Sequence, residues 1–470
     1  MPAFKHRAVM LDPARLMDRK DQYDLLLPWL KRWGYNTLHL HFADDEGCRV
    51  VLPSHPDLAA EGAWTAEEMR TFVRRAKKLG LSVIPEIECF GHTAFITRRP
   101  GYRELGASPA TGFNAINPRL PATRKLLKDL LTDVADIFSS SPVIHVGLDE
   151  VNLRVLPGHE LDSDDQLAQV FARHTAWVHD QVRKLGRRPA MWGDHLLAAP
   201  KIADRLKKDV LIFDWHYSPH DEPANSGQTL RFFTDRGFEA WTSPSTLCWL
   251  SRVVTSAGNL ANIRQLAATA LLHKAAGVSG AVNTVWCPYR FLTGAMDYPI
   301  ALGGHLFSAA DEDPDFARQF AREFYGLSAG DARTCAEALG RLHAAAPTNH
   351  LYDRIILGKG WAGRFDRESR RAAGLLAQEA TAVAGLLQPL VRRAKQHGDR
   401  LNDVCTSALI LERVGQFGAA NRRKRELPDG KALLRAAIRA WQRTRTTPWN
   451  AADYHSTSTQ MLLPTLTGLT

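Results

Sequence analysis

Short apolar runs alternate with amphipathic helical patterns along roughly the first 300 residues. Each run is rich in β-branched and aromatic residues, and a stretch with apolar residues at helical spacing follows it. The clearest helix is 65–80, because Thr65 and Glu68 form a capping-box pattern at its start. Further helices are predicted at about 120–138 and 164–186. The expected strands are 7–12, 36–42, 82–88, 143–150, 189–194, 209–217, 238–244 and 280–286.

This repeated strand-then-helix order favours a parallel sheet, because parallel neighbours need a crossover connection. Eight such units fit a closed (β/α)8 TIM-type barrel. A doubly wound open sheet is the alternative, and it typically carries a glycine-rich nucleotide loop after its first strand. The stretch L-D-P-A-R at 11–15 contains no glycine. We therefore expect the α/β class, with a catalytic (β/α)8 barrel over residues 1–310.

The chain changes character after about residue 310. The stretch 370–395 is rich in alanine and leucine at helical spacing, and no further cluster of strand formers follows it. We expect residues 311–470 to form a C-terminal α-helical domain that packs on the barrel.

Polar, acidic and aromatic residues gather where the expected strands end. In a (β/α)8 barrel the carboxyl ends of the strands meet at one face, and active sites lie there. One such ending would mean little, but six or seven indicate a site. These residues are Asp12, Asp44, Asp45, Glu46, Glu86, Glu88, His92, Asp149, Glu150, Trp192, Asp194, His195, Asp214, Trp215, His216, Tyr217 and Trp286.

This mixture of residues is typical of a carbohydrate site. Aromatic rings stack on sugar rings, and carboxylates, arginine and histidine bind hydroxyl groups. Carboxylates also carry out glycosidic cleavage. A metal site is the competing interpretation, because the same side chains are metal ligands, but no H-E-x-x-H or calcium-loop pattern is present. We expect a glycan substrate, no metal and no cofactor.

Charge and composition bear on the other classes of function. The net charge of +10 would suit a nucleic-acid partner, but the basic residues are scattered, so we expect none. No run approaches the ~18 apolar residues of a membrane span, and the start M-P-A-F-K-H-R lacks a leader's apolar stretch. Six widely spaced cysteines without a C-x-x-C pair suggest free thiols. We expect a cytoplasmic protein without membrane contact, and a homodimer is left open.

The run V-I-H-V-G-L-D-E at 143–150 ends in two adjacent carboxylates, Asp149 and Glu150. Ionising both in a partly dry site is unfavourable. Neighbouring residues of a regular strand also point to opposite faces. Both side chains can reach the mouth of a barrel only if the backbone bends, so we expect an irregular strand end here.

Four stretches, in order, resemble motifs of glycoside hydrolase family 20, the exo-β-N-acetylhexosaminidases. H-V-G-L-D-E at 145–150 resembles the signature H-x-G-x-D-E, and R-A-V-M-L-D-P-A-R at 7–15 resembles R-G-L-M-L-D-x-x-R. L-H-L-H-F-A-D-D-E-G-C-R at 38–49 resembles L-H-L-H-x-x-D-D-Q-G-W-R, and V-I-P-E-I-E-C-F-G-H at 83–92 resembles V-I-P-E-I-D-x-P-G-H. The pattern is similar to the hexosaminidase D branch, which lacks the family's usual N-terminal domain.

The resemblance implies different tasks for the two adjacent carboxylates. Glu150 matches the general acid/base, and Asp149 matches the residue that orients the substrate's 2-acetamido group and stabilises an oxazolinium intermediate. The acetamido oxygen is then the nucleophile, so that no enzyme carboxylate attacks the sugar. We expect Glu150 to hold a proton near neutral pH, with the negative Asp149 helping to raise its pKa.

The resemblance also implies roles in substrate binding. Arg7 matches an arginine that binds sugar hydroxyls, with an ion pair at the barrel floor as the alternative. Asp45 and His92 match pocket residues, with a turn residue and a core histidine as the alternatives. Asp194 lies at the end of the fifth strand, beside the pocket. The expected pocket walls, for which core packing is the alternative, are Trp192, Trp215 and Trp286.

Two departures from the family pattern concern specificity. In place of the family's Y-L-D, whose tyrosine binds the acetamido oxygen, the chain has C-W-L-S at 248–251, and we expect Tyr217 to substitute. In place of W-x-E, whose glutamate binds O4 and O6, it has W-C-P at 286–288. The choice between GlcNAc and GalNAc is therefore open, with tolerance for GalNAc expected. A catalytically inactive or altered-specificity amino-sugar-binding barrel is the alternative.

Overall fold

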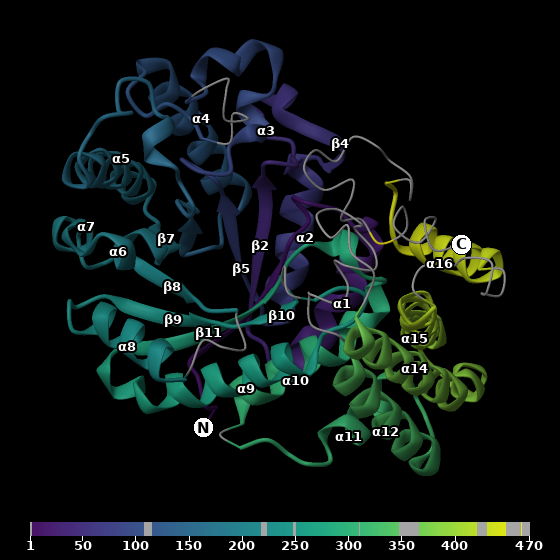
Figure 1. Ribbon diagram of the computed structural model, residues 1–470. Coiled ribbons are helices and arrows are strands. Elements are labelled where there is room, and N and C mark those ends of the chain that lie inside the picture. The colour runs from purple at the N-terminus through teal and green to yellow at the C-terminus, as the bar shows by residue number, and fades with distance from the viewer. Residues whose placement is uncertain are drawn as a thin grey trace. The chain divides into compact units, whose positions relative to one another are not determined.

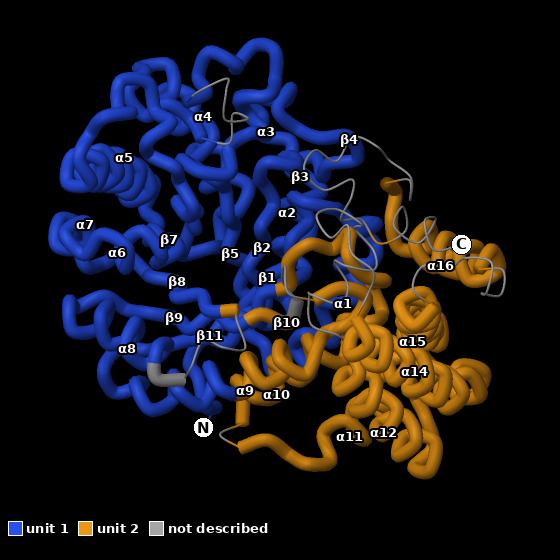
Figure 2. Tube along the Cα trace, viewed as in Figure 1, with its two compact units in different colours: residues 1–216, 220–244, 265–284 blue, residues 217–219, 245–264, 285–470 orange. Residues whose placement is uncertain are grey.

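The computed structural model describes residues 2–107, 115–217, 223–247, 251–309, 311–346, 366–420, 430–447 and residue 462. The chain divides into two compact units, drawn blue and orange in Figure 2. Unit 1 comprises 1–216, 220–244 and 265–284, and unit 2 comprises 217–219, 245–264 and 285–470. The units exchange segments between 217 and 285, so the expected division at residue 310 stays a prediction.

Unit 1 contains a closed barrel of eight parallel strands, which confirms the predicted (β/α)8 fold (Figure 1). Each strand pairs with the next around the ring, and pairing of the first strand with the second closes it, with Ala8 opposite Thr37. The barrel strands are β1 (His6–Leu11), β2 (Thr37–Asp44), β5 (Ser82–Ile87), β6 (Val143–His145), β7 (Arg188–Trp192), β8 (Leu211–Trp215), β9 (Glu239–Ser243) and β11 (Val278–Val285).

Amphipathic helices connect the strands, and Figure 1 shows α5, α7 and α8 outside them. In α2 the predicted capping box is present, because Thr65 and Glu68 each bond to the other's backbone N–H. A second capping box, Ser163 with Gln166, starts α5. The connecting helices are α1 (Lys20–Arg32), α2 (Ala66–Lys78), α4 (Pro121–Ile137), α5 (Asp164–Lys184), α6 (Asp194–Ala198), α7 (Pro200–Arg205), α8 (Pro223–Thr234) and α9 (Ala257–Leu272).

Two short strands that the sequence pattern did not predict follow β2. β3 (Gly47–Val50) turns back antiparallel to β2, and β4 (Ala59–Trp64) runs parallel to β3. They extend the sheet beyond the barrel at the carboxyl end of β2. The turn from β2 into β3 thereby holds Asp44, the last residue of β2, and Asp45 at the barrel mouth.

Unit 2 is mainly helical, in agreement with the expected C-terminal helical region. A buried ion pair joins two of its segments, with Arg400 NH1 2.9 Å from Asp297 Oδ1. Asp403 accepts from the Gly294 backbone N–H at 3.0 Å and pairs with Arg443 at 2.6 Å. Its helices are α10 (Asp297–Ser308), α11 (Phe316–Phe324), α12 (Ala329–Ala345), α14 (Arg367–Arg393), α15 (Gly398–Ala419) and α16 (Lys431–Thr444).

No helix in the described part of the chain is both long enough and apolar enough to cross a membrane.

Candidate active site

The segment after β6 departs from regular strand geometry and places both adjacent carboxylates at the barrel mouth. β6 ends at His145, and Gly147, Leu148 and Glu150 all have positive φ, of 65°, 75° and 49°. The predicted irregular strand end is therefore confirmed. The side chain of Asp149 is 15% exposed and that of Glu150 is 53% exposed. One carboxylate is thus sheltered, and the other faces solvent.

Glu88 lies directly behind this bend. The Leu148 N–H donates to Glu88 Oε2 at 3.3 Å, and the Glu88 side chain is completely buried. Burial and the negative charges of Asp149 and Glu86 raise the pKa of Glu88 well above its ordinary value. The raised pKa favours the neutral acid form of Glu88, which supports the bend through its contact with the Leu148 N–H.

Replacing Gly147 with alanine is expected to lower the free energy of unfolding more than replacing Gly186 does. Both glycines have positive φ, 65° and 71°, so the backbone strain is shared. An added Cβ at Gly147 would lie 1.9 Å from Glu88 Oε2, whereas nothing lies within 4 Å at Gly186. The difference should be about 1–3 kcal/mol, which is the typical cost of overpacking a buried site. Urea unfolding of the two variants measures it, and equal losses would contradict the close packing described here.

His92 connects the two adjacent carboxylates with the acids that follow β2. Its Nε2 lies 3.4 Å from Glu150 Oε2 and 3.9 Å from Asp149 Oδ2. Its Nδ1 lies 3.2 Å from Asp45 Oδ2 and 3.3 Å from Asp44 Oδ1. Asp45 also accepts from the Ala94 backbone N–H at 2.9 Å. The structure thus brings together four residues predicted for the site: Asp45, His92, Asp149 and Glu150.

Two side chains just after β7 bind the backbone of the bend at 147–151 from its other side. The Glu150 backbone N–H donates to Asp194 Oδ2 at 3.0 Å, and the Val151 N–H donates to His195 Nε2 at 2.8 Å. Asp194 therefore lies where it was predicted, next to the adjacent carboxylates. In the free protein it binds the backbone of the loop.

The two carboxylates titrate in the reverse of the expected order. Burial, together with the charge of Asp194, raises the pKa of Asp149 to about 7, although His92 opposes the shift. The hydrogen bond from His92 lowers the pKa of Glu150. Burial alone would lower the pKa of His92, but Asp44 and Asp149 outweigh it and raise that pKa well above 6.5. In the free protein the proton therefore favours Asp149, because the cationic His92 faces the exposed Glu150.

The structure does not bring Arg7 to this site. Arg7 is the second residue of β1, and its guanidinium donates to the backbone carbonyls of Gly34 at 2.6 Å and Phe4 at 2.8 Å. Parallel strands all begin at the same end of a barrel, so Arg7 lies at the end opposite to Asp149. The structure therefore does not support the predicted contact between Arg7 and the sugar, because the Arg7 guanidinium binds backbone carbonyls at the other end of the barrel.

Arg15, which the sequence reasoning missed, occupies the mouth instead. Its NH2 lies 2.7 Å from Asp44 Oδ2 and its NH1 lies 3.2 Å from Asp12 Oδ2, and its side chain is 6% exposed. The signal was present in the sequence, because R-A-V-M-L-D-P-A-R ends in a second arginine beyond the end of β1. Strand direction is what distinguishes the two arginines.

The predicted aromatic walls have different surroundings. Trp192 is 1% exposed and packs inside the barrel, which does not support its role as a pocket wall. Trp215, at the end of β8, is partly exposed. Tyr217 and Trp286 belong to unit 2, where the Trp286 indole N–H donates to the Tyr217 hydroxyl at 2.9 Å. Trp249, which stands in the family's tyrosine motif, lies outside the described residues.

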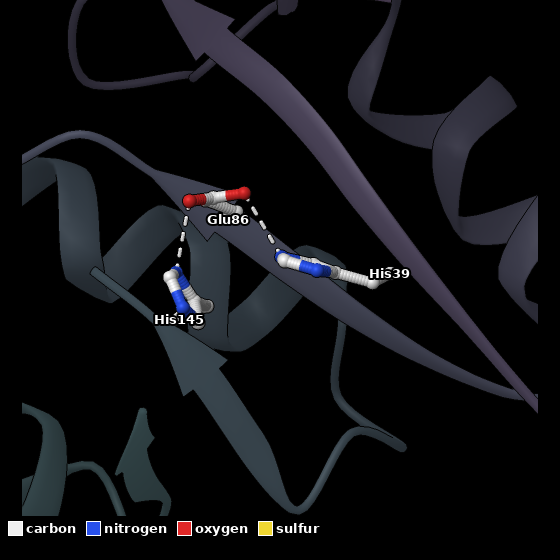
Figure 3. Close-up of side chains that lie close together, drawn as sticks. All are labelled: His39, Glu86 and His145. Carbon is white, nitrogen blue, oxygen red and sulfur yellow. Dashed lines mark ion pairs between the residues drawn. The ribbon is translucent and has the colours of Figure 1, made fainter. Parts of the chain in front are cut away.

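A buried carboxylate, Glu86, is the centre of a network beneath the site. Its Oε1 accepts from the Trp192 indole at 2.7 Å and lies 2.9 Å from His145 Nδ1. Its Oε2 lies 2.7 Å from His41 Nδ1 and 2.9 Å from His39 Nε2. Figure 3 shows His39 and His145 on either side of Glu86. Four side-chain nitrogen atoms from three other strands thus lie close to one carboxylate, and two of them, Trp192 Nε1 and His41 Nδ1, are hydrogen-bonded to it.

This network continues from Glu86 to the bend that carries Asp149 and Glu150. His41 Nε2 lies 2.7 Å from Asp44 Oδ2, and Asp44 contacts both Arg15 and His92. Burial alone would raise the pKa of Glu86, but its histidine neighbours lower it well below 4.5, and the pKa of His41 is raised well above 6.5. Negative and positive groups therefore alternate from Glu86 to Glu150. The H-L-H pattern at 39–41 was the sequence signal for this network.

Three groups among the described residues have donors close enough to hold a metal ion. Each group includes Glu86 or Asp44, whose oxygens already contact histidine, tryptophan or arginine nitrogens. A cation bound there would have to displace these contacts. The three groups are His39 with Glu86 and His145, His41 with Glu86 and Glu88, and Asp44 with Asp45 and His92.

Known proteins match the first part of the chain. A β-hexosaminidase of Vibrio furnissii is 28% identical over 253 residues, which cover 46% of this chain and 40% of that protein. A β-N-acetylhexosaminidase of Cellulomonas fimi is 30% identical over 210 residues, which cover 41% of this chain and 40% of that protein. The matched region thus spans less than half the length of these relatives.

Solved structures share the fold. The β-N-acetylhexosaminidase of Bacteroides fragilis aligns with a TM-score of 0.56 at 18% identity, covering 68% of this chain and 69% of that one. The N-acetyl-β-hexosaminidase of Streptomyces plicatus aligns with a TM-score of 0.53 at 22% identity, covering 72% and 69%. The family described as "Glycosyl hydrolase family 20, catalytic domain" matches residues 4–270, more than half of the 470 residues. The chain belongs to glycosyl hydrolase family 20.

Proposed function

We propose that the protein is an exo-acting, retaining β-N-acetylhexosaminidase that releases terminal GlcNAc, GalNAc or both. The observation that carries this proposal is the pair Asp149–Glu150 at the carboxyl end of the barrel strands, with His92 within 4 Å of both. A sheltered carboxylate beside an exposed one supplies the two roles that glycosidic cleavage needs. Family membership supports the same reaction class.

In this proposal Glu150 protonates the leaving-group oxygen. A bound sugar would cover the half-exposed Glu150 and remove it from water, which raises its pKa. The single proton that the pair holds in the free protein would then move from Asp149 to Glu150. Asp149, now ionised, orients the substrate's acetamido group, whose oxygen attacks the anomeric carbon and forms the oxazolinium intermediate.

Binding of the sugar hydroxyls is assigned to the mouth of the barrel. Arg15 replaces Arg7 in this role, because it lies beside Asp44 at the carboxyl end of β1. Trp215 at the end of β8 supplies a partly exposed ring. The role expected of Tyr217 at the acetamido oxygen remains a prediction from the sequence. A cytoplasmic location and the 1–310/311–470 domain division remain predictions from the sequence.

Hydrolysis of three aryl β-glycosides tests the function. Aryl β-GlcNAc and aryl β-GalNAc should be cleaved with retention of the β configuration in the first product, as seen by NMR. Aryl β-glucoside has no acetamido group and should be cleaved at most at a trace rate. Cleavage of the glucoside at a comparable rate would exclude substrate assistance. Binding of GlcNAc without any turnover would favour the inactive sugar-binding alternative.

The profile of kcat/KM against pH should fall on its alkaline side with an apparent pKa near 7. The active pair carries one proton, and that proton is lost as pH rises through the pKa of about 7. Asp194→Asn should move this limb to lower pH, because the negative charge of Asp194 helps to raise the pKa of Asp149. The exposed Asp235→Asn is the control. If the alkaline side of the profile did not move in Asp194→Asn, the charge of Asp194 would not raise the pKa of Asp149 as described.

A further inference from the structure

Unit 1 contains a cavity of about 190 Å³ that the proposed function does not use. Its lining comes from the segment that leads into α4, from the first turn of α4, from α5 and from the loop before α5. Five of its seven lining residues are arginine or histidine, and none is acidic. The residues are Pro118, Arg119, Arg124, His159, Val170, Arg173 and His174.

Three of the lining residues are exposed arginines. Arg119 NH1 donates to the Pro157 backbone carbonyl at 3.3 Å, and the Arg124 guanidinium lies 5.5 Å from the centre of the Trp177 ring. Neither contact neutralises charge. Cations gathered around one hollow repel one another, and a bound anion relieves that repulsion.

Two buried histidines supply a second, independent observation. His174 Nε2 lies 2.9 Å from the carbonyl oxygen of Cys89, so this nitrogen carries the hydrogen. Burial lowers the pKa of His174 to about 4, which leaves the ring neutral and Nδ1 an acceptor. His174 Nδ1 and His159 Nε2 are both buried without a hydrogen-bond partner. A bound group that donates a hydrogen bond would satisfy either atom, as buried polar atoms of native structures usually are.

We propose that this cavity binds an oxyanion that carries, or lies next to, a hydroxyl group. The guanidinium groups of Arg119, Arg124 and Arg173 donate to the anionic oxygens, as arginine forks do with phosphate, sulfate and carboxylate. The hydroxyl donates to His174 Nδ1. Hydrogen phosphate and a sugar sulfate both meet this description, whereas inorganic sulfate lacks the hydroxyl.

Isothermal titration of the full chain with three probes at constant ionic strength tests the proposal. Hydrogen phosphate and glucose 6-sulfate should each bind saturably at one site, and inorganic sulfate should bind more weakly than either. Tighter binding of glucose 6-sulfate than of phosphate would identify a group on a sugar as the ligand, and the reverse would identify the free ion. Glucose 6-sulfate lacks the acetamido group, so the result does not depend on the hexosaminidase proposal.

Matched arginine variants locate the site. Arg173→Ala and Arg124→Ala should each weaken binding by roughly ten-fold or more, which is typical for the loss of a charge-assisted hydrogen bond. Arg333→Ala, which removes an exposed arginine on α12, should leave binding unchanged. All three side chains are exposed, so the fold should survive. Absence of saturable binding, or an equal loss in Arg333→Ala, would overturn the proposal.

Discussion

Replacing Glu150 with glutamine should lower kcat for a β-GlcNAc glycoside with a poor leaving group by roughly 10²–10⁴-fold, the usual contribution of a general acid. Glutamine keeps the size of the side chain and its contact with His92 but cannot give up a proton. The loss should be much smaller for a nitrophenyl glycoside, because that leaving group departs without protonation. Steady-state kinetics on both substrates measures the difference.

A control substitution shows whether the loss of kcat is specific to Glu150. Glu104 is exposed, and Glu104→Gln should leave kcat and KM unchanged for both substrates. Equal losses for poor and good leaving groups in Glu150→Gln would mean that Glu150 is not the proton donor. Full activity in Glu150→Gln would transfer that role to another acid.

Replacing Glu86 with glutamine should lower the free energy of unfolding by about 3–5 kcal/mol, as expected when one member of a buried charge network is removed. Both oxygens of Glu86 now face side-chain nitrogen atoms. A glutamine would keep only one acceptor oxygen, and its NH₂ group would point at other donors. His41 would also lose one of its two neighbouring carboxylates, since Glu86 and Asp44 each lie 2.7 Å from one of its ring nitrogens. Urea unfolding at neutral pH measures the loss, and Glu61→Gln, on the exposed face of β4, is the control.

The pH dependence of this loss has a defined sign. Glu86 has a lowered pKa in the folded protein, so its charge stabilises the fold above its ordinary pKa of 4.5. The difference between wild type and Glu86→Gln should therefore be complete near neutral pH and shrink as pH falls through the lowered pKa. A difference that stays constant down to acidic pH would show that packing, not charge, accounts for the loss.

The two substitutions also distinguish a residue that takes part in the reaction from one that supports the fold. Glu150→Gln should change kcat without changing stability, because its side chain is half exposed. Glu86→Gln should change stability first, and activity only because the contacts of His41 and Asp44 orient His92. A normal free energy of unfolding together with reduced kcat in Glu86→Gln would assign the network a direct part in setting the protonation of His92.

The sequence by itself determined the barrel and the position of its acids. Alternation of strand and helix patterns is a local property, because each element's periodicity follows from which face it buries. The eight expected strands all occur in the barrel, and the bend at Asp149 and Glu150 followed from the alternation of side chains in a strand. The position of Asp194 beside this bend was likewise readable from the end of one strand.

Only the tertiary structure decided which arginine lies at the mouth and how the acids share protons. Arg7 and Arg15 belong to one motif, but the direction of β1 puts them at opposite ends of the barrel. The burial of Trp192 and the contacts of Glu86 depend on the register between strands that are far apart in the sequence. The order of the Asp149 and Glu150 pKa values depends on the distance to His92 and on solvent exposure. Such quantities arise from contacts between distant segments, and no local pattern specifies them.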